Sequence, residues 1–236
     1  KVPLNSRYAH DLPKMADAVT ERTKLVFIAN PNNPTGTIVR RAELNAFLER
    51  IPEQVLVVLD EAYFEFARED EEYPDGIDYL HRGKNVVVMR TFSKTYGLAG
   101  LRIGYLFAQS EVTDAIERVR EPFNVNSLGQ AAAVAALSDS AHIERTVQNN
   151  RHGIGRISEA LSAAGAEAGE SFANFVFADL KRPARPVFEA LLRRGVIIRS
   201  GEAFGTPTCV RVSVGTDEEI DIFVEEFRNV MQELDR

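Results

Sequence analysis

The residues best able to do chemistry lie in three polar segments, and each segment directly follows a run of apolar residues. The segments are 30–36 (Asn-Pro-Asn-Asn-Pro-Thr-Gly), 60–63 (Asp-Glu-Ala-Tyr) and 90–94 (Arg-Thr-Phe-Ser-Lys). If the apolar runs form parallel strands, these segments lie at the carboxyl edge of the sheet, where open α/β proteins bind ligands. We therefore expect one crevice surrounded by side chains from all three segments: Asn33, Asp60, Tyr63 and Lys94.

Lys94 and Asp60 together suggest chemistry on an aldehyde. A second cation near Lys94, such as Arg90 or Arg102, would lower the pKa of its amine, and a neutral amine can form a Schiff base with an aldehyde. A buried Asp60 would need a cationic partner, which a protonated pyridine nitrogen could supply. Pyridoxal phosphate (PLP) carries an aldehyde, a pyridine ring and a phosphate, and a lysine with a carboxylate is the pairing expected for it.

Five further side chains are candidates for binding anions. Thr91, Ser93 and Arg102 offer hydroxyl and guanidinium donors to a cofactor phosphate. In the second half of the chain, Arg199 and Arg211 each lie on a predicted strand. Arg211 alternates with apolar neighbours, so it should point away from them and could bind a carboxylate or phosphate with two hydrogen bonds. For Arg199, an exposed strand arginine is an equally good interpretation.

Each of these features also has a plainer interpretation. A lysine in Ser-Lys-Thr is far more often a solvated surface residue, Asp60 could cap a helix, and residues 31–36 could form a rigid turn. Residues 55–61 resemble the Walker B strand of ATPases, but the Gly-x-x-x-x-Gly-Lys-Ser/Thr loop that should precede it is absent from the sequence. The occurrence of all three segments in order, each at a strand end, favours a shared site.

The elements that must position these residues follow from the apolar pattern. Residues 25–29, 55–59 and 86–89 are continuous apolar runs, typical of strands that are buried on both faces of a parallel sheet. A helical pattern around Leu44 and Phe47 separates the first two runs, which predicts a right-handed crossover and an α/β layer structure. No long helix precedes the fourth run, 101–107, so this strand could run antiparallel.

The second half of the chain has a different character. Residues 128–164 lack proline and predict one long helix or two abutting helices. Further strands are predicted at 174–178, 196–199 and 209–214, and further helices at 186–194 and 218–234. We therefore expect an α/β domain over 1–140, with a mostly parallel sheet between helices, and a smaller α+β domain over 141–236.

Composition limits the classes of partner. The 236 residues include 35 acidic and 28 basic side chains, with a net charge of −7, which argues against nucleic acid or an anionic membrane as a partner. The single cysteine, Cys209, excludes an internal disulfide and fits a reducing compartment, so we expect a cytoplasmic protein. The four histidines match no metal-ligand spacing, and no apolar run approaches a membrane span.

The three segments resemble those of class I/II aminotransferases of PLP fold type I. The third continues as Ser-Lys-Thr-Tyr-Gly-Leu-Ala-Gly-Leu-Arg-Ile-Gly over 93–104. Within the family, residues 90–105 and 211–216 are most similar to histidinol-phosphate aminotransferases. The resemblance implies a large PLP-binding domain, incomplete here, and a small C-terminal α+β domain.

The resemblance also assigns roles. It implies that Lys94 forms the Schiff base, that Asp60 pairs with the pyridine nitrogen, and that the remaining residues bind as follows: Asn33 and Tyr63 the ring hydroxyl, Thr91, Ser93 and Arg102 the phosphate, Arg211 the substrate carboxylate, and Arg199 a second substrate anion. The implied reaction transfers an amino group from histidinol phosphate to a 2-oxo acid, 2-oxoglutarate, in histidine biosynthesis, within a homodimer and without a metal.

Other functions remain open on this reasoning. An aromatic amino-acid aminotransferase and a threonine-phosphate decarboxylase share the cofactor residues, and a non-catalytic aminotransferase-like module could sense a ligand. The chain begins Lys1-Val2-Pro3, whereas the family carries an upstream segment that completes the cofactor site. We therefore expect an N-terminal part to be missing, and this chain alone to be poorly soluble or to bind PLP weakly.

Overall fold

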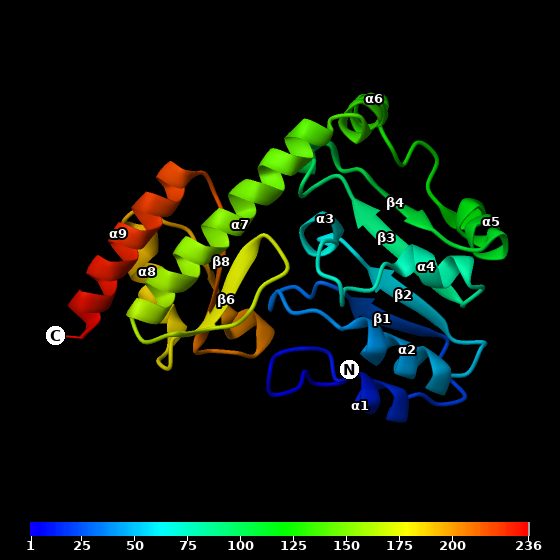
Figure 1. The fold of residues 1–236 in the computed structure, drawn as a ribbon, viewed down its shortest axis with the longest axis horizontal. Coiled ribbons are helices and arrows are strands. Elements are labelled where there is room, and N and C mark those ends of the chain that lie inside the picture. Colours follow the sequence, from blue (N-terminus) through cyan, green and yellow to red (C-terminus); the bar gives the residue numbers. More distant parts are fainter. Residues whose placement is uncertain (236) are drawn as a thin grey trace. The chain divides into compact units, whose positions relative to one another are not determined.

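The computed structural model describes residues 1–235, which divide into two compact units (Figure 1). Unit 1 contains residues 1–32 and 38–144, and unit 2 contains residues 33–37 and 145–236. The chain therefore passes from unit 1 to unit 2 after Glu144. The sequence predicted a domain boundary after residue 140, with residues 33–37 in the first domain. The backbone accounts for this grouping, because the Phe172 amide donates a hydrogen bond to the Gly36 carbonyl, 2.8 Å away.

Unit 1 is built on a four-stranded sheet with the order β1-β2-β3-β4. Strands β1 (Leu25–Ala29), β2 (Leu56–Asp60) and β3 (Val86–Thr91) are parallel, and β4 (Gly104–Phe107) is antiparallel to β3. Between β3 and β4 the chain forms only the short 3₁₀ turn η1 (Ala99–Leu101). Parallel neighbours are usually joined by a crossover that contains an α-helix, and the link over 92–103 contains no α-helix, in keeping with the expected antiparallel strand.

Three of the helices described in unit 1 contribute to its larger core. The helices of unit 1 are α1 (Leu12–Asp17), α2 (Arg41–Arg50), α3 (Phe64–Ala67), α4 (Gly76–His81), α5 (Ser110–Val119), α6 (Ser127–Leu137) and the first residues of α7 (Ser140–Ala163). Buried side chains of α1, α2 and α4 pack with Ile28, Val57 and Val86 in one core.

Strand β1 departs from the predicted burial on both faces. Leu25 and Phe27 are 50% and 63% exposed, whereas Val26 and Ile28 contact the core that contains α1 and α2. Successive side chains of a strand point to opposite faces, and these helices cover only the face that carries Val26 and Ile28. A continuous apolar run therefore does not reveal whether both faces are covered.

Unit 2 is an α+β unit with an antiparallel sheet in the order β5-β6-β8-β7. Its elements are β5 (Glu167–Ala168), β6 (Phe175–Asp179), β7 (Arg199–Ser200), β8 (Cys209–Ser213), the rest of α7, α8 (Ala184–Arg193), the 3₁₀ turn η2 (Gly201–Phe204) and α9 (Asp217–Leu234). A buried core joins α7, α8 and α9 to β6 and β8.

In the second half of the chain, one prediction about helices is confirmed and one about a strand is mostly wrong. The proline-free stretch forms two abutting helices, α6 and α7, which confirms that alternative. The strand predicted over 196–199 is wrong except at its last residue, because only Arg199 enters β7. Ile197 is 78% exposed, so its apolar character does not reflect a place in the sheet.

Within residues 1–235, no helix combines the length and apolar character required to span a bilayer. The same residues contain no group of three or more His, Cys, Asp or Glu side chains arranged to hold a metal ion.

Candidate active site

The carboxyl ends of β2 and β3 border a pocket of about 860 Å³ in unit 1. Its walls also include residues of β4 and α5. Besides Arg90, five of the residues singled out in the sequence line this pocket: Asp60, Thr91, Ser93, Lys94 and Arg102. An amine, a carboxyl group, two hydroxyls and a guanidinium therefore face one cavity, which is a donor and acceptor set suited to a small anionic ligand.

Asp60 and Lys94 interact electrostatically across this pocket. Burial raises the pKa of Asp60, while a hydrogen bond from the Ala62 amide (3.1 Å) and the charge of Lys94 oppose the rise. Lys94 also lies over Tyr63, with its Nζ 5.2 Å from the ring centroid. Asp60 is thus a partly desolvated acid that would gain from a further cationic partner.

The loop after β3 holds Lys94 through local hydrogen bonds. The Ser93 amide donates to Thr91 Oγ1 (3.0 Å), and the Gly97 amide donates to the Lys94 carbonyl (2.9 Å). Gly97 has φ +71°, a left-handed conformation in which glycine has no steric cost. His142 Nε2 donates to the carbonyl of Thr95 (3.1 Å), so both neighbours of Lys94 are tied to fixed groups.

Arg102 lines the same pocket in an unusual backbone conformation. It has φ +54°, and its Nη1 donates to the Ala99 carbonyl at 2.8 Å. A non-glycine residue in the left-handed region is uncommon, and such residues cluster at functional sites. The exposed guanidinium therefore lies on a backbone that the surrounding loop must hold in place.

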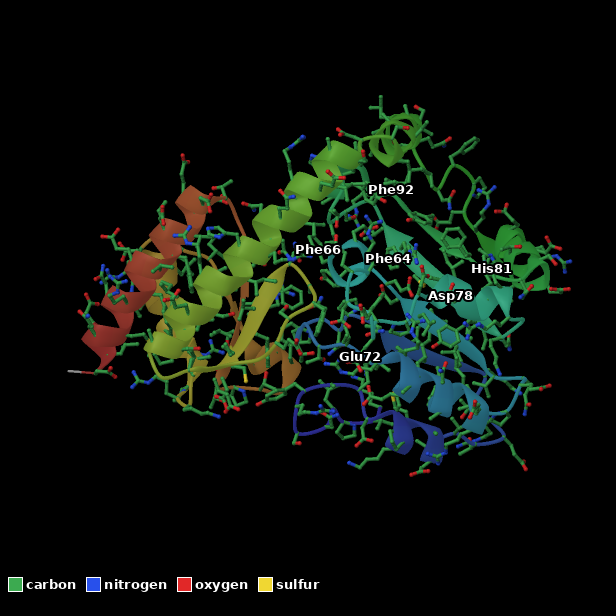
Figure 2. The ribbon with its side chains drawn as sticks, in the orientation of Figure 1. Phe64, Phe66, Glu72, Asp78, His81 and Phe92 are labelled. Carbon is green, nitrogen blue, oxygen red and sulfur yellow. The ribbon has the colours of Figure 1, made fainter. Side chains whose placement is uncertain are left out.

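Arg90, one of the two cations that the sequence suggested near Lys94, lines the same pocket. Its guanidinium pairs with Glu61 and Asp75 and lies 3.3 Å from the centroid of the Phe64 ring. Phe64 itself is found beside the carboxyl ends of β2 and β3 (Figure 2). This buried pair was not predicted from the sequence. Its visible signals were an arginine at the end of an apolar strand and an acidic residue directly after Asp60.

The other predicted residues belong to unit 2. Arg211 Nη1 donates to Asn33 Oδ1 at 2.6 Å, and its guanidinium carbon lies 4.9 Å from the Phe175 ring centroid. Val210 and Val212 are buried on either side of a half-buried Arg211, so the alternation expected for this strand is confirmed.

Arg199 and Arg211 are register partners on β7 and β8. Both line a second pocket, of about 460 Å³, together with Arg185, Ser200 and Ser213. Glu202 lies in the same wall and pairs with Arg185, so Arg199 and Arg211 are the arginines of this pocket best suited to an anionic ligand. Of the four residues expected around one crevice, Asp60, Tyr63 and Lys94 thus lie together in unit 1, whereas Asn33 lies with Arg211 in unit 2.

Comparison with known proteins identifies the family. The model of the family "Aminotransferase class I and II" matches residues 1–227. The chain belongs to the class I and II aminotransferases. The match extends over both units of this aminotransferase chain, so the resemblance noted in the three polar segments is confirmed along nearly its whole length.

The chain is similar to several curated aminotransferases. It is 48% identical over 232 residues to histidinol-phosphate aminotransferase 2 of Carboxydothermus hydrogenoformans, covering 98% of this chain and 64% of that protein. It is 52% identical over 217 residues to histidinol-phosphate aminotransferase 2 of Methylococcus capsulatus, covering 92% and 58%. The chain therefore spans about three fifths of the length of these relatives.

A solved structure shows the same architecture. The histidinol-phosphate aminotransferase of Sinorhizobium meliloti, in complex with pyridoxal-5'-phosphate, superposes with a TM-score of 0.92 at 33% identity, covering 99% of this chain and 64% of that one. The predicted fold class is thereby confirmed: an α/β aminotransferase fold of type I, with a mostly parallel sheet and an α+β part that follows it.

Proposed function

We propose that the protein is a PLP-dependent aminotransferase that transfers the amino group of histidinol phosphate to a 2-oxo acid, 2-oxoglutarate, in histidine biosynthesis. The observation that carries this proposal is that the amine of Lys94 and the carboxyl group of Asp60 line one pocket. Family membership supports the transamination, and the names of the relatives support the amino donor.

The residues around the pocket of unit 1 fit the cofactor. Lys94 offers an amine to its aldehyde, Asp60 a carboxylate to its ring nitrogen, and three residues offer donors to its phosphate: Thr91, Ser93 and Arg102. By the resemblance of their motifs, Asn33 and Tyr63 are assigned to the ring hydroxyl. When bound, the cofactor supplies an aldehyde that condenses with amines and a ring that accepts electrons.

The chain's own residues would then bind and move protons. The Nζ amine of Lys94 takes the proton from Cα of the amino substrate and acts as the general acid and base. Asp60, whose pKa burial raises, would gain a cationic partner by accepting a hydrogen bond from the protonated ring nitrogen. Arg211 binds the carboxylate of the 2-oxo acid with a planar pair of donors, and Arg199 binds a second substrate anion.

The assembly and setting belong to the same proposal. We assign residues 1–140 to the PLP-binding large domain and residues 141–236 to the small C-terminal domain. We further propose a homodimer, which the family resemblance implies, and a cytoplasmic location, because the sequence carries a single cysteine, which fits a reducing compartment.

The direct test is to trap the bond to the cofactor. The purified protein is incubated with PLP and reduced with borohydride, and its peptides are then mapped by mass. Phosphopyridoxyl should appear on Lys94 and vanish in Lys94→Ala, whereas Lys84→Ala, a change at an exposed lysine of the same unit, should keep the label. A label distributed over surface lysines would overturn the proposal and leave the non-catalytic, ligand-sensing alternative.

A comparison of half-reactions identifies the substrate. Histidinol phosphate should change the cofactor absorbance faster than phenylalanine does. A faster response to phenylalanine would replace the proposed donor with an aromatic amino acid, and release of carbon dioxide from threonine phosphate would indicate a decarboxylase.

A further inference from the structure

The strongest interaction near the site that the proposed chemistry does not use is a buried ion pair between Glu61 and Arg90. Arg90 Nε and Nη2 both donate to Glu61 Oε2, at 2.9 and 2.8 Å. The side chains are 2% exposed for Glu61 and 8% for Arg90. Arg90 Nη2 also donates to Asp75, at 2.7 Å, but the Asp75 side chain is 36% exposed.

Neighbouring groups contact both members of this ion pair. The Gly76 amide donates to Glu61 Oε1 at 2.7 Å, and a Cβ on Gly76 would lie only 2.7 Å from that oxygen. The ring of Phe64 covers the guanidinium of Arg90. Both Glu61 oxygens therefore accept from fixed donors, and Arg90 is held by an aromatic face as well as by two carboxylates.

Stability alone does not explain such a pair. Taking two charges out of water costs about as much as their attraction returns, and apolar residues of similar volume are often as good or better. A buried ion pair is better suited to fixing a geometry, because Arg90 Nε and Nη2 converge on the single oxygen Glu61 Oε2, and two hydrogen bonds to one acceptor restrict the separation and orientation of the side chains.

The geometry that this pair would fix is that of the pocket floor. Asp60 is paired in register with Met89, and the Glu61 amide donates to the Met89 carbonyl at 2.8 Å. Glu61 and Arg90 are thus the residues that directly follow this aligned pair on the two strands. Arg90 also lines the pocket that Asp60, Met89 and Lys94 line. The ion pair therefore joins the two strand ends at the pocket, one residue after Asp60 in β2 and four residues before Lys94.

We propose that Glu61 and Arg90 are positioning residues, whose ion pair ties the carboxyl ends of β2 and β3 together and thereby sets the separation of Asp60 and Lys94. The importance of that separation for transamination rests on the proposed function. The separation itself does not, because it can be measured without the cofactor.

The test measures how readily Lys94 reacts in the protein free of PLP. Lys94 and Asp60 interact electrostatically, and a carboxylate favours the charged amine. If the ion pair between Glu61 and Arg90 is lost, Asp60 should no longer be held near Lys94, and the Lys94 amine should deprotonate more readily. In Glu61→Gln, reductive methylation of Lys94 by formaldehyde should therefore have an apparent pKa lower by about half a unit, or run about threefold faster at fixed pH near neutrality.

Two comparisons separate positioning from a general loss of structure. Rates are expressed relative to Lys84, an exposed lysine in the same unit and the same digest. Asp75→Asn is the matched control: it removes a carboxylate from Arg90 but leaves the pair across the strands, and asparagine can still accept the hydrogen bond from the Ile77 amide. Its Lys94 to Lys84 rate ratio should stay at the wild-type value.

A second variant covers the case in which Glu61→Gln does not fold. Arg90→Lys keeps the charge but loses the fork on Glu61 and the stacking on Phe64, so it should shift the ratio in the same direction. An unchanged ratio in both variants would overturn the proposal, whatever happens to the melting temperature. An equal shift in Asp75→Asn would also overturn it, and so would failure of both variants to fold, because the pair would then be a folding requirement.

The two proposals can fail separately. If wild-type Lys94 takes up no phosphopyridoxyl label, the proposed function fails while the methylation ratios still test the tie. If the label appears on Lys94 but the ratios do not move, the aminotransferase assignment stands and the positioning role fails.

Discussion

At the scale of single residues, the ionised carboxyl group of Asp60 lowers the stability of the ligand-free protein, and a bound cation could remove that loss. It is half-buried at the end of β2, where burial raises the pKa of its carboxyl group even though the Ala62 amide and Lys94 oppose the rise. An acid in this state binds its proton more tightly in the folded chain than in the unfolded one. A bound cation would reverse that preference, so one side chain couples folding stability to ligand binding.

We predict that Asp60→Asn stabilises the ligand-free protein at neutral pH while weakening the binding of PLP. Because the folded-state pKa is raised, ionising Asp60 lowers stability as pH rises from about 4, near its value in the unfolded chain. Below that pH both states are protonated and the two proteins should be equally stable. Thermal melts from pH 3.5 to 8 would measure the difference in stability between Asp60→Asn and the wild type, which is the gap to be followed. Glu53→Gln, a change at an exposed carboxylate, serves as the control. A gap that does not change with pH would contradict the account.

A second prediction concerns Arg211 in the pocket of unit 2. Arg211→Lys keeps the charge but loses the planar pair of donors, and hydrogen bonds to charged groups contribute about 1.5–3 kcal/mol each. The KM for the 2-oxo acid should therefore rise about tenfold or more, while the borohydride label on Lys94 persists. Arg185→Lys, in the wall of the same pocket, serves as the control and should change KM much less.

At the scale of elements, helix α7 shows how packing decides what a glycine does. Gly153 and Gly155 lie two residues apart in the same helix, and by helix propensity alone both should weaken it. A Cβ on Gly153 would approach Val214 Cγ1 to 2.5 Å and Ile220 Cδ1 to 2.8 Å, whereas one on Gly155 would meet nothing within 4 Å. Gly153 therefore permits close packing of α7 on α9 and the end of β8.

We predict opposite effects for the two alanine substitutions in α7. Gly155→Ala should stabilise the protein by about 0.5–1 kcal/mol, the gain expected from helix propensity. Gly153→Ala should destabilise it, because overpacking costs about 1–3 kcal/mol and outweighs the same gain. Urea unfolding of the two variants measures both values. Equal stabilisation would show that the contact with Val214 and Ile220 relaxes without cost.

At the scale of the whole molecule, each of the two described units has its own large core. The core of unit 2 is drawn from residues between 157 and 231, and the core of unit 1 described above from residues between 12 and 86. Each is assembled from its own helices and its own sheet. Since local opening follows buried apolar contacts, the two units should respond separately to damage.

We predict that a cavity in one core leaves the other largely protected. Leu191→Ala removes a fully buried side chain of unit 2 and should cost about 2–5 kcal/mol. Hydrogen exchange should then speed up in peptides of β6, α8 and α9, with little change in peptides of β1 to β3. Leu44→Ala, in the core of unit 1, should give the reverse pattern. The same loss of protection in every peptide for both variants would mean that the units unfold as one.

The sequence by itself determined what depends on short stretches of chain. The order of the strands of the first sheet and of the helix between the first two followed from apolar periodicity, and the antiparallel β4 from a link without a long helix. The grouping of Asp60 with Lys94 followed from the meeting of parallel strand ends at one edge. These properties depend on neighbours in the sequence and on general rules of sheet geometry, so one chain was enough to predict them.

Only the tertiary structure decided which groups meet when they are far apart in the chain. It paired Arg90 with Glu61 and Asp75, brought Asn33 to Arg211 across 178 positions, and left Leu25 and Phe27 exposed. The physical reason is that burial and pairing depend on which surfaces cover a side chain. The sequence around an arginine at the end of an apolar strand does not reveal whether its side chain contacts water, a substrate or a buried acid.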